Sequence, residues 1–289
     1  MDGKIAIVVD TNSGISPQIA EQLGVLVVPM PFIIDGIDYF EGINLDSNNF
    51  YNKLISDANI STSQPSIGSI TETWDEALKN NNYILHIPMS SALSKCCETC
   101  KMLASQQEYE GKVFVVDNQR ISKTLEHSVK EALDLIKAGK SAQEIKNILE
   151  ERANECTIYL MVDTLKYLKK GGRITPAAAL LGTLLGIKPI LKIQGGKLDA
   201  FSKCRTVKQA KRIMLNQIKE DIKNKFNNEE VDIVFAEAFS KGEIEIFKEE
   251  AKKELNNIDE NIGKLSFSIT CHTGPGVIGI GCCKKHVSK

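Results

Sequence analysis

The first half of the chain alternates short apolar runs with helical segments, and no other feature of the sequence constrains the fold as strongly. The apolar runs are rich in β-branched residues and occupy residues 5–9, 25–28, 83–88 and 112–117. Segments with helical patterning or helix-capping residues separate them. Strands that alternate with helices indicate parallel crossovers, so residues 1–154 are predicted to form a doubly wound α/β domain.

Residues 155–289 follow a different pattern, in which hairpins mix with helices. A hairpin is predicted across Gly195 and Gly196, between two apolar runs. Further strands are predicted at residues 157–163, 231–238, 264–271 and 277–283, and helices at residues 206–225 and 242–255. Such a mixture is typical of an α+β domain. The fold class expected for the whole chain is therefore α/β with two domains, and with a ligand between them.

Three cationic side chains surround a pair of glycines in the stretch LKKGGRI. Lys169, Lys170 and Arg173 flank Gly171 and Gly172, which can take the positive backbone dihedrals that end a helix. We therefore expect a helix to end here, on a basic turn.

An apolar helix is predicted directly after this turn, with Pro176 at its first position. Every residue from Ala177 to Leu185 is apolar, Gly or Thr, so the pattern predicts a helix that is buried all round. It is too short to cross a membrane. Small residues at helical spacing leave a groove along it, which fits either the protein core or the wall of a slot for a slim apolar ligand: Ala178, Gly182 and Gly186.

Composition excludes some classes of function. Of the 289 residues, 42% are hydrophobic, which is enough for a sizeable core, and the formal net charge is −1. A general nucleic-acid-binding protein needs a basic surplus to neutralise phosphates, so nucleic acid is not an expected partner. The apolar run at the start is too short for a signal peptide, and no later run reaches membrane length. We expect a cytoplasmic protein that does not span a membrane.

The chain has eight cysteines, at positions 96, 97, 100, 156, 204, 271, 282 and 283. In a protein that is not exported, they are expected to be reduced thiols. Cys96, Cys97 and Cys100 are close enough to suggest a metal site, but no His or second CxxC motif completes a zinc ligand set. No metal site is therefore predicted.

Four strings in the chain occur in the same order in a known family. They are DTNSGIS at residues 10–16, STSQPS at residues 61–66, KGGRI at residues 170–174 with GIKPIL after it, and HTGPGVIG at residues 272–279. With these strings spread over nearly its whole length, the sequence resembles the DegV family of bacterial fatty-acid-binding proteins, which includes fatty acid kinase B subunits. The resemblance implies that the protein binds a long-chain fatty acid.

Three hydroxyl-rich loops precede predicted helices, at residues 10–13, 61–66 and 90–94. Free backbone N–H groups and the helix dipole favour an anion at such positions, although ordinary helix caps would explain the same hydroxyl groups. His272 follows the strand predicted at residues 264–271 and precedes a Gly-Pro-Gly turn, which can fix its imidazole in a cleft. A lone histidine is more often structural, so the residue types alone leave both interpretations open.

The resemblance implies a role for these residues. In the DegV family a His, a Thr and a Ser of the matching motifs hold the fatty acid carboxylate, which implicates His272, Thr62 and Ser94, with Ser63 and Ser91 as neighbours. Two hydroxyl groups and an imidazole suit a carboxylate, which accepts several hydrogen bonds. Apart from the bound fatty acid, no cofactor or metal is expected.

The segment around Ser94 departs from the family motif. The family has an SSGLSGTYQSA-type string, whereas this chain reads SSALSKCCETC, with Ala92, Lys95 and Cys96 in place of Gly, Gly and Thr. Lys95 either adds a charge to the site or faces solvent. The string DNQRIS at residues 117–122 replaces the family's commoner Asp-Ser start, which leaves the role of this loop open.

The resemblance also implies a partner. In the family, a separate kinase subunit phosphorylates the bound carboxyl group and gives an acyl phosphate. Arg173 matches the arginine of the KGGRI motif and is our candidate for pairing with that phosphate or with the acidic surface of the kinase, while Lys169 and Lys170 are weaker candidates. The chain contains no P-loop, no GxGxxG motif after a strand and no nucleophile elbow, so we do not expect an enzyme.

A small-molecule or ester hydrolase is the alternative interpretation. Ser94, His272 and either Asp10 or Asp117 could form a catalytic triad, because triads are defined in space and not by sequence order. Nothing in the spacing of these residues requires one. Acyl-chain binding is therefore the function that we predict.

Overall fold

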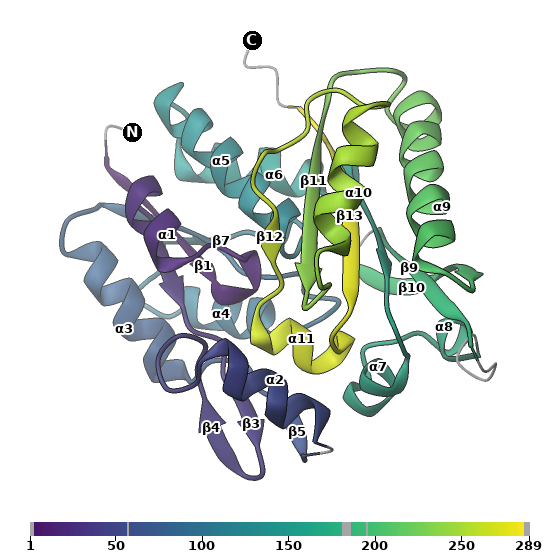
Figure 1. Cartoon of the computed structure of the whole chain (residues 1–289). Helices are drawn as coiled ribbons and strands as arrows, with labels where there is room; N and C mark the ends of the chain where they lie inside the picture. The colour runs from purple at the N-terminus through teal and green to yellow at the C-terminus, as the bar shows by residue number, and fades with distance from the viewer. Residues whose placement is uncertain (1–2, 57, 181–185, 195, 286–289) are drawn as a thin grey trace.

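The computed structural model describes residues 3–56, 58–180, 186–194 and 196–285 (Figure 1). These residues form a parallel sheet, a larger mixed sheet and a small antiparallel sheet, with helices packed against them. The predicted α/β fold class is confirmed.

The parallel sheet is built from the first half of the chain. Its strands lie in the order β2-β1-β6-β7, and all neighbours are parallel. The strand bounds are β1 Ile5–Asp10, β2 Leu26–Val28, β6 Tyr83–Ile87 and β7 Val113–Val115. The helices that accompany them are α1 Pro17–Leu23, α3 Ile67–Leu78, α4 Cys96–Ala104, α5 Lys123–Lys137 and α6 Ala142–Glu151. All four predicted strands are present.

Alternate residues of these strands point to opposite faces of the sheet, and each face has its own core. Ala6 and Val8 of β1 pack with residues of α3 and α4, including the fully buried Trp74. Ile7 and Val9 pack with residues of α1, α5 and α6. Helices therefore cover both faces, as a doubly wound sheet requires.

A small antiparallel sheet of order β4-β3-β5 lies between β2 and α3 in the chain. Its strands are β3 Phe32–Ile34, β4 Ile37–Tyr39 and β5 Ile60–Thr62, and α2 Ser47–Ile55 separates the last two. Asp35 and Gly36 both have positive φ, 51° and 81°, which matches the two-residue hairpin turn between β3 and β4. β5 pairs with β3 so that Thr62 lies opposite Phe32.

The mixed sheet has the order β10-β9-β8-β13-β11-β12. Its neighbours are antiparallel, except that β11 and β12 are parallel. The bounds are β8 Cys156–Met161, β9 Lys188–Gln194, β10 Lys197–Cys204, β11 Val231–Ala238, β12 Gly263–Lys264 and β13 Val277–Lys284. The predicted hairpin between β9 and β10 is confirmed, and Gly195 in its turn lies outside the described residues.

The two faces of the mixed sheet have different neighbours. One face packs under α9 (Val207–Glu220) and α10 (Glu243–Lys252), and a π-helical turn, Asp221–Lys225, extends α9. The other face contributes Leu160, Leu191 and Val277 to the same core cluster as α5. The two larger sheets thus share a core, with α5 and α6 between them (Figure 1). The sheets change between β7 and β8, and the domain boundary at residues 154 and 155 stays a prediction.

The strand predicted at residues 264–271 is wrong. Only Gly263–Lys264 form a strand, β12, and Phe267–Thr273 form a helix, α11. The hydroxyl of Ser266 caps this helix by accepting a backbone N–H of its first turn at 3.2 Å. His272 therefore lies in the last turn of a helix and does not follow a strand.

The helix predicted after the basic turn begins as expected but is not buried all round. It is α8, Pro176–Leu180, and it packs against β10. Pro176 and Ala177 are exposed, whereas Ala178 is fully buried, so the helix has a solvent face at its start. Residues 181–185, over which the prediction continues, lie outside the described part of the chain.

Two cysteines are joined in a disulfide, which corrects the expectation of eight reduced thiols. Cys156 and Cys283 lie directly opposite each other on β8 and β13, with Cα atoms 4.3 Å apart. Residues opposite each other in an antiparallel pair are close enough for a disulfide, but their separation of 127 residues in the sequence conceals this. Six further cysteines are free thiols, and all six are buried.

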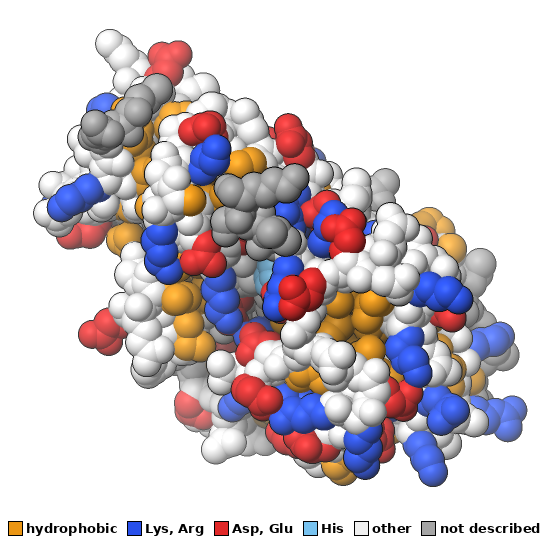
Figure 2. Space-filling model, turned by 90° about the horizontal axis from the view of Figure 1, so that it is seen from above, with side chains coloured by type: hydrophobic (Ala, Val, Ile, Leu, Met, Phe, Trp, Pro, Cys, Tyr) orange, Lys and Arg blue, Asp and Glu red, His pale blue; other side chains and the backbone are white. Residues whose placement is uncertain are grey.

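The surface agrees with the near-neutral charge of the chain. Figure 2 shows one face of the molecule, over the middle of which Asp and Glu side chains lie among Lys and Arg side chains. Within the described ranges, no helix combines the length and the apolar character that crossing a membrane requires.

Candidate functional site

A cavity of about 490 Å³ lies where the parallel sheet meets the mixed sheet. The parallel sheet contributes residues that follow the carboxyl ends of its strands: Asn12 after β1, Met89 after β6, and Ile121 and Ser122 after β7. In open α/β sheets ligands bind at this edge. The mixed sheet and α11 contribute the rest of the wall.

The floor of the cavity is the face of the mixed sheet that α9 and α10 do not cover. Leu160, Gly279 and Ala236 lie side by side on β8, β13 and β11, and all three line the cavity. The next row toward α5 is Ile158, Gly281 and Val234, and it continues into Ile193 and Leu198 of β9 and β10. The floor is therefore apolar throughout.

The two glycines of β13 differ in the space around them. A Cβ atom added at Gly279 would have its nearest neighbour at 3.5 Å, an ordinary contact, so the space above this residue belongs to the cavity. A Cβ atom at Gly281 would meet a methyl group of Val234 at 2.9 Å and one of Thr124 at 3.2 Å. Gly279 therefore lowers the floor, whereas Gly281 lets the first turn of α5 pack on the sheet.

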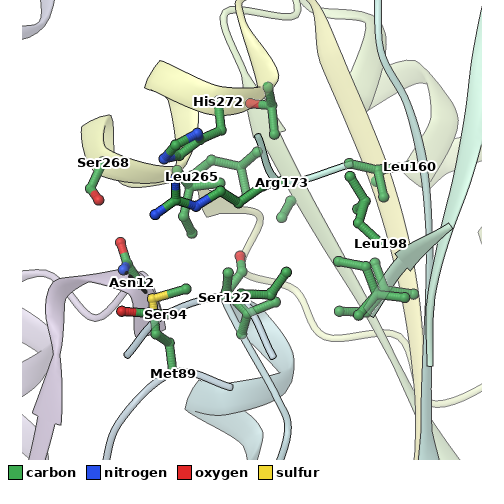
Figure 3. Close-up of a pocket in the computed structure, with 18 of the residues that line it drawn as sticks. Asn12, Met89, Ser94, Ser122, Leu160, Arg173, Leu198, Leu265, Ser268 and His272 are labelled. Atoms are coloured by element: carbon green, nitrogen blue, oxygen red, sulfur yellow. Dashed lines mark hydrogen bonds between the residues drawn. The ribbon is translucent and has the colours of Figure 1, made fainter. Parts of the chain in front are cut away.

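The polar groups of the cavity gather at one end (Figure 3). There the Thr62 Oγ1 atom lies 2.8 Å from Nε2 of His272. Thr62 ends β5, and His272 is in the last turn of α11, which packs against β5 and α7. The structure thus brings together two of the residues implicated by the resemblance.

Gly171 and Gly172 in the basic turn are each required for a different structural reason. Helix α7, Lys166–Gly171, ends at Gly172, whose φ of 66° is left-handed. A Cβ atom at Gly171 would run into the imidazole of His272, so only glycine allows this approach. Arg173 follows, and its Nη1 donates to the carbonyl of Gly171 at 2.6 Å. In Figure 3 the side chains of Arg173 and His272 are directed toward the same part of the cavity.

His272 is neutral at ordinary pH. Burial, and then the positive charge of Arg173, lower the pKa of His272 from 6.5 to about 4. A neutral imidazole carries one N–H, and Nδ1 has no hydrogen-bond partner among the described residues. A buried N–H without a partner is costly, so we place the proton on Nε2, donating to Thr62. The hydroxyl proton of Thr62 is then free to point into the cavity.

The three predicted serines are placed differently. Ser63 and Ser94 line the cavity, whereas Ser91 does not, and its backbone N–H donates to Asp117 at 3.3 Å. The Ser94 hydroxyl accepts the N–H of Cys96 at 3.2 Å and keeps its own proton for another partner. The side chain of Lys95 is 79% exposed and its amine pairs with Glu98, and the residue also lines the cavity.

The predicted slot residues do not form the wall that the described residues show. Ala178 is fully buried in the core and does not line the cavity. Gly186 is exposed and does not line it either, and Gly182 lies outside the described residues. Among the described residues, the sheet floor lines the cavity and Ala178 and Gly186 do not, so the acyl-chain slot along the helix stays a prediction.

Several lining residues were not predicted. The loop with Asn12 was recognised as hydroxyl-rich, but the amide bridges Met89 and Ser266, at 2.7 and 2.6 Å, which only the folded chain reveals. Ser122 and Ser268 also line the cavity. The string VIGIG on β13 carries the one signal that could have been used, since glycine at every second position leaves one strand face without side chains.

In the described part of the chain, Ser94, His272, Asp10 and Asp117 are not joined by hydrogen bonds as a catalytic triad would be. Asp10 is fully buried and accepts the backbone N–H groups of Asn12 and Met89, at 2.9 and 2.8 Å, and burial raises the pKa of its carboxyl to about 6. Asp117 pairs with Lys101. His272 is bonded to Thr62 and has the cation Arg173 beside it, which disfavours the imidazolium that a triad must form. Over the described ranges, no group of His, Cys, Asp and Glu is arranged to hold a metal ion.

The pKa of His272 predicts how acid affects stability. Between about pH 6.5 and pH 4 the unfolded chain binds a proton at this residue that the folded protein does not, so its contribution to the free energy of unfolding falls as pH falls. His272→Gln removes this loss. Relative to wild type, the variant should gain up to about 3 kcal/mol between neutral pH and pH 4 in urea unfolding.

Ser63→Ala is the control for this measurement, because it changes a cavity residue that does not titrate. The difference in the free energy of unfolding between Ser63→Ala and the wild type should stay constant over the same pH range. If the difference in the free energy of unfolding between His272→Gln and the wild type also stayed constant, this would contradict the burial of a neutral imidazole.

Comparison with known proteins identifies relatives of the whole chain. Residues 4–285 match the profile of the DegV family, described as uncharacterised proteins. A DegV domain-containing protein of Deinococcus radiodurans is 32% identical over 278 residues, which are 96% of this chain and 97% of that protein. A DegV domain-containing protein of Staphylococcus aureus is 28% identical over 98% of this chain and 99% of its own length.

Solved structures share the fold from end to end. A DegV family protein from Thermus thermophilus, whose structure concerns fatty acid binding, has a TM-score of 0.87 at 28% identity and covers 98% of this chain and 100% of its own. DegV of Bacillus subtilis, a fatty acid binding protein, has a TM-score of 0.86 at 27% identity with the same coverage. Since the family profile, the curated relatives and the solved folds all span nearly the whole sequence, this chain belongs to the DegV family.

Proposed function

We propose that this protein binds one long-chain fatty acid in the cavity between its two larger sheets. The observation that carries the proposal is the division of the cavity into a polar end, with Thr62, His272 and Ser94, and an apolar floor on the mixed sheet. A carboxylate fits the first and an acyl chain the second. The solved relatives from Thermus thermophilus and Bacillus subtilis, which bind fatty acids, support this assignment.

The two ends of the ligand would contribute differently to binding. Each methylene group transferred from water to the apolar floor is worth about 0.8 kcal/mol, so a long tail supplies most of the affinity. The head group supplies orientation. The hydroxyl groups of Thr62 and Ser94 can both donate to a carboxylate, and Arg173 is a cation that lines this end of the cavity.

His272→Ala tests the head-group assignment. The substitution removes the group that positions the Thr62 hydroxyl, and losing a hydrogen bond to a charged carboxylate costs about 1.5–3 kcal/mol. Affinity for stearic acid, measured by calorimetry, should therefore fall by about one to two orders of magnitude. His127→Ala is the matched control, because His127 pairs with Asp232 and does not line the cavity.

Two outcomes would contradict this assignment. Unchanged affinity in His272→Ala would remove His272 from the site. Hydrolysis of p-nitrophenyl acyl esters above the rate of a Ser94→Ala variant, in a protein that yields no lipid on organic extraction, would favour the hydrolase interpretation instead.

The depth of the floor predicts which chain lengths fit. Because a side chain at Gly279 would project into open cavity space, Gly279→Leu should fold and should weaken long-chain fatty acids more than short ones. A leucine side chain has about the size of four methylene groups. Native mass spectrometry should therefore show a larger decrease in bound stearic acid than in bound lauric acid for the variant.

Gly281→Ala provides the contrast for Gly279→Leu. Its methyl group meets Val234 and Thr124, so it should lower the free energy of unfolding by about 1–3 kcal/mol without changing the preference for chain length. An equal loss of long and short chains in Gly279→Leu would show that the tail does not lie on this floor.

We further propose that a separate kinase subunit phosphorylates the bound carboxyl group, with Arg173 pairing with the phosphate or with the kinase. Arg173 lines the polar end of the cavity and also a groove of about 130 Å³ on the other side of the Thr62–His272 pair. Lys166 and Lys170 line the same groove, which makes it cationic. Lys169 is exposed and lines neither.

Arg173→Ala separates presentation from binding. Fatty acid affinity should change little, because the tail supplies most of it, whereas acyl-phosphate formation with an added kinase and ATP should fall at least tenfold. Lys169→Ala, which removes a neighbouring cation outside the groove, should leave both unchanged. Equal losses of binding and of phosphate formation in Arg173→Ala would assign the arginine to fatty acid binding alone.

A further inference from the structure

We propose that a second binding site lies on the opposite face of the mixed sheet from the fatty acid cavity, and that it takes a small molecule in which a phosphate group is attached to an aromatic ring system. The site is a pocket of about 280 Å³ at the edge of the sheet where β8 and β11 end and β13 begins. A mononucleotide is a ligand of this class. The proposal does not depend on fatty acid binding.

The alternation of residues along two strands separates this pocket from the cavity. Met161 and Ile278 lie opposite each other on β8 and β13, and both line the pocket. Their neighbours Leu160 and Gly279 line the cavity. Successive residues of a strand point to opposite faces of the sheet, so the two sites lie on different faces.

Two helices begin at this pocket. β10 and β11 both run parallel to β8, so α9 and α10, which follow them and pack on the same face, start at the same edge of the sheet (Figure 1). Val207, the first residue of α9, and Glu243, the first residue of α10, both line the pocket. The positive ends of two helix dipoles therefore lie at this pocket and favour an anion.

The two helix ends differ in how their N–H groups are satisfied. The Thr206 hydroxyl caps α9 by accepting the backbone N–H of Gln209 at 3.2 Å. Gly242 precedes α10, and no side chain in the described ranges caps this helix. N–H groups of the first turn of α10 thus remain available to a ligand.

The hydroxyl group of Ser240 is an independent observation that points to a ligand. Ser240 lies in the loop between β11 and α10, lines the pocket and is only 7% exposed. Its backbone N–H donates to Glu237 at 2.9 Å, whereas its hydroxyl has no hydrogen-bond partner among the described residues. The hydroxyl oxygen is not enclosed by protein, so it can reach a group in the pocket. Buried hydroxyl groups are normally paired, and this one can donate to an acceptor on a ligand.

The charged side chains of the pocket leave one cation for the ligand. Asp163 binds Lys188 at 2.6 Å. Glu243 binds the buried amine of Lys211, also at 2.6 Å. Lys241 lines the pocket too and forms no ion pair within the part of the chain that the structure describes. An ammonium group, a hydroxyl and unpaired N–H groups suit a phosphate, which has three strong acceptor oxygens.

Aromatic side chains lie next to these polar groups. The rings of Tyr51 and Phe239 contact each other, with centroids 4.8 Å apart, and both line the pocket. Pro275 adds a further apolar surface. Because Phe239 directly precedes Ser240, a ring that packs on Phe239 is close to the phosphate position. A phosphate ion alone would leave this apolar part of the pocket without a partner, so we assign it to the ring of the ligand.

Calorimetry on the full chain tests the site with two probes, adenosine monophosphate (AMP) and phenyl phosphate, and with their counterparts adenosine and phenol. Each phosphate should bind more tightly than its counterpart. In Ser240→Ala, affinity for AMP should fall by about one to two orders of magnitude, the loss expected for a hydrogen bond to a charged group. Saturating the protein with stearic acid should leave the affinity for AMP unchanged, because the cavity is on the other face of the sheet.

Lys241→Asn is a second test, which keeps the backbone conformation. Lys241 has a φ of 53°, and asparagine tolerates this left-handed region. The variant should bind AMP more weakly, and its affinity should depend less on salt. Lys253→Ala is the matched control, because it removes an exposed cation at the other end of α10, outside the pocket. Its affinity for AMP should equal that of the wild type.

Four results would overturn the proposal. If neither AMP nor phenyl phosphate binds, the ligand class is wrong. Equal affinities for the phosphates and their counterparts would remove the phosphate contact. An affinity for AMP that is unchanged in both Ser240→Ala and Lys241→Asn would place AMP elsewhere on the protein. Displacement of AMP by stearic acid would assign AMP to the fatty acid cavity.

Discussion

The hydrogen bond between Thr62 and His272 holds together the polar end of the cavity, and three distant segments depend on it. Thr62 is positioned by the pairing of β5 with β3, and His272 by the helix that Ser266 caps. The imidazole also packs against Gly171, where the side chain of any other residue would clash with it. The bond joins residues that are 210 positions apart, so the site exists only when both halves of the chain have folded against each other.

The neutral state of His272 determines how the site can treat an anion. If the imidazole were protonated, it would place a second positive charge beside Arg173 in a buried position, and the lowered pKa of His272 reflects that cost. Arg173 and Lys95, two cations that line the cavity, are both exposed, so solvent would screen their attraction for a carboxylate. The Thr62–His272 pair contributes direction, because its geometry is fixed by burial. In the function that we propose, affinity and orientation would thus come from different parts of the cavity.

The parallel sheet could be predicted from the sequence because buried parallel strands are continuous apolar runs between helices, a pattern with few alternatives. The helix α11 could not. In the string FSITCH, polar and apolar residues alternate as in a half-buried strand. In the structure Phe267 and Cys271, four residues apart, join the aromatic cluster of Phe32 and Phe50, while Ser268 and His272, also four apart, line the cavity. Residues that alternate with a period of two also recur every four residues, the spacing that places side chains on one face of a helix. Over seven residues, alternation alone therefore cannot distinguish a strand from a helix. Only the N-terminal cap at Ser266 distinguishes them, and it depends on the fold around it.

The site was predictable where a short string determines it and not where it depends on what lies opposite. The motifs that contain Thr62, Ser94 and His272 are local, whereas the disulfide of β8 with β13, the amide of Asn12 and the backbone N–H of Ser122 acquire their partners only through tertiary contacts.

Strand β13 shows this limit of sequence-based prediction most clearly, because one of its faces packs in the core and the other borders the cavity. Ile278, Ile280 and Cys282 fill a dense core with residues of α9 and α10, and this face stabilises the sheet. The other face presents glycine at positions 279 and 281, of which Gly279 leaves room in the cavity and Gly281 lets the first turn of α5 pack on the sheet. Where the sheet borders the cavity, it lacks the van der Waals contacts that packed side chains would make. The contacts on the face covered by α9 and α10 offset that loss of stability. An acyl chain lying over Gly279 would restore the missing contacts, so the protein and its proposed ligand complete one apolar layer together.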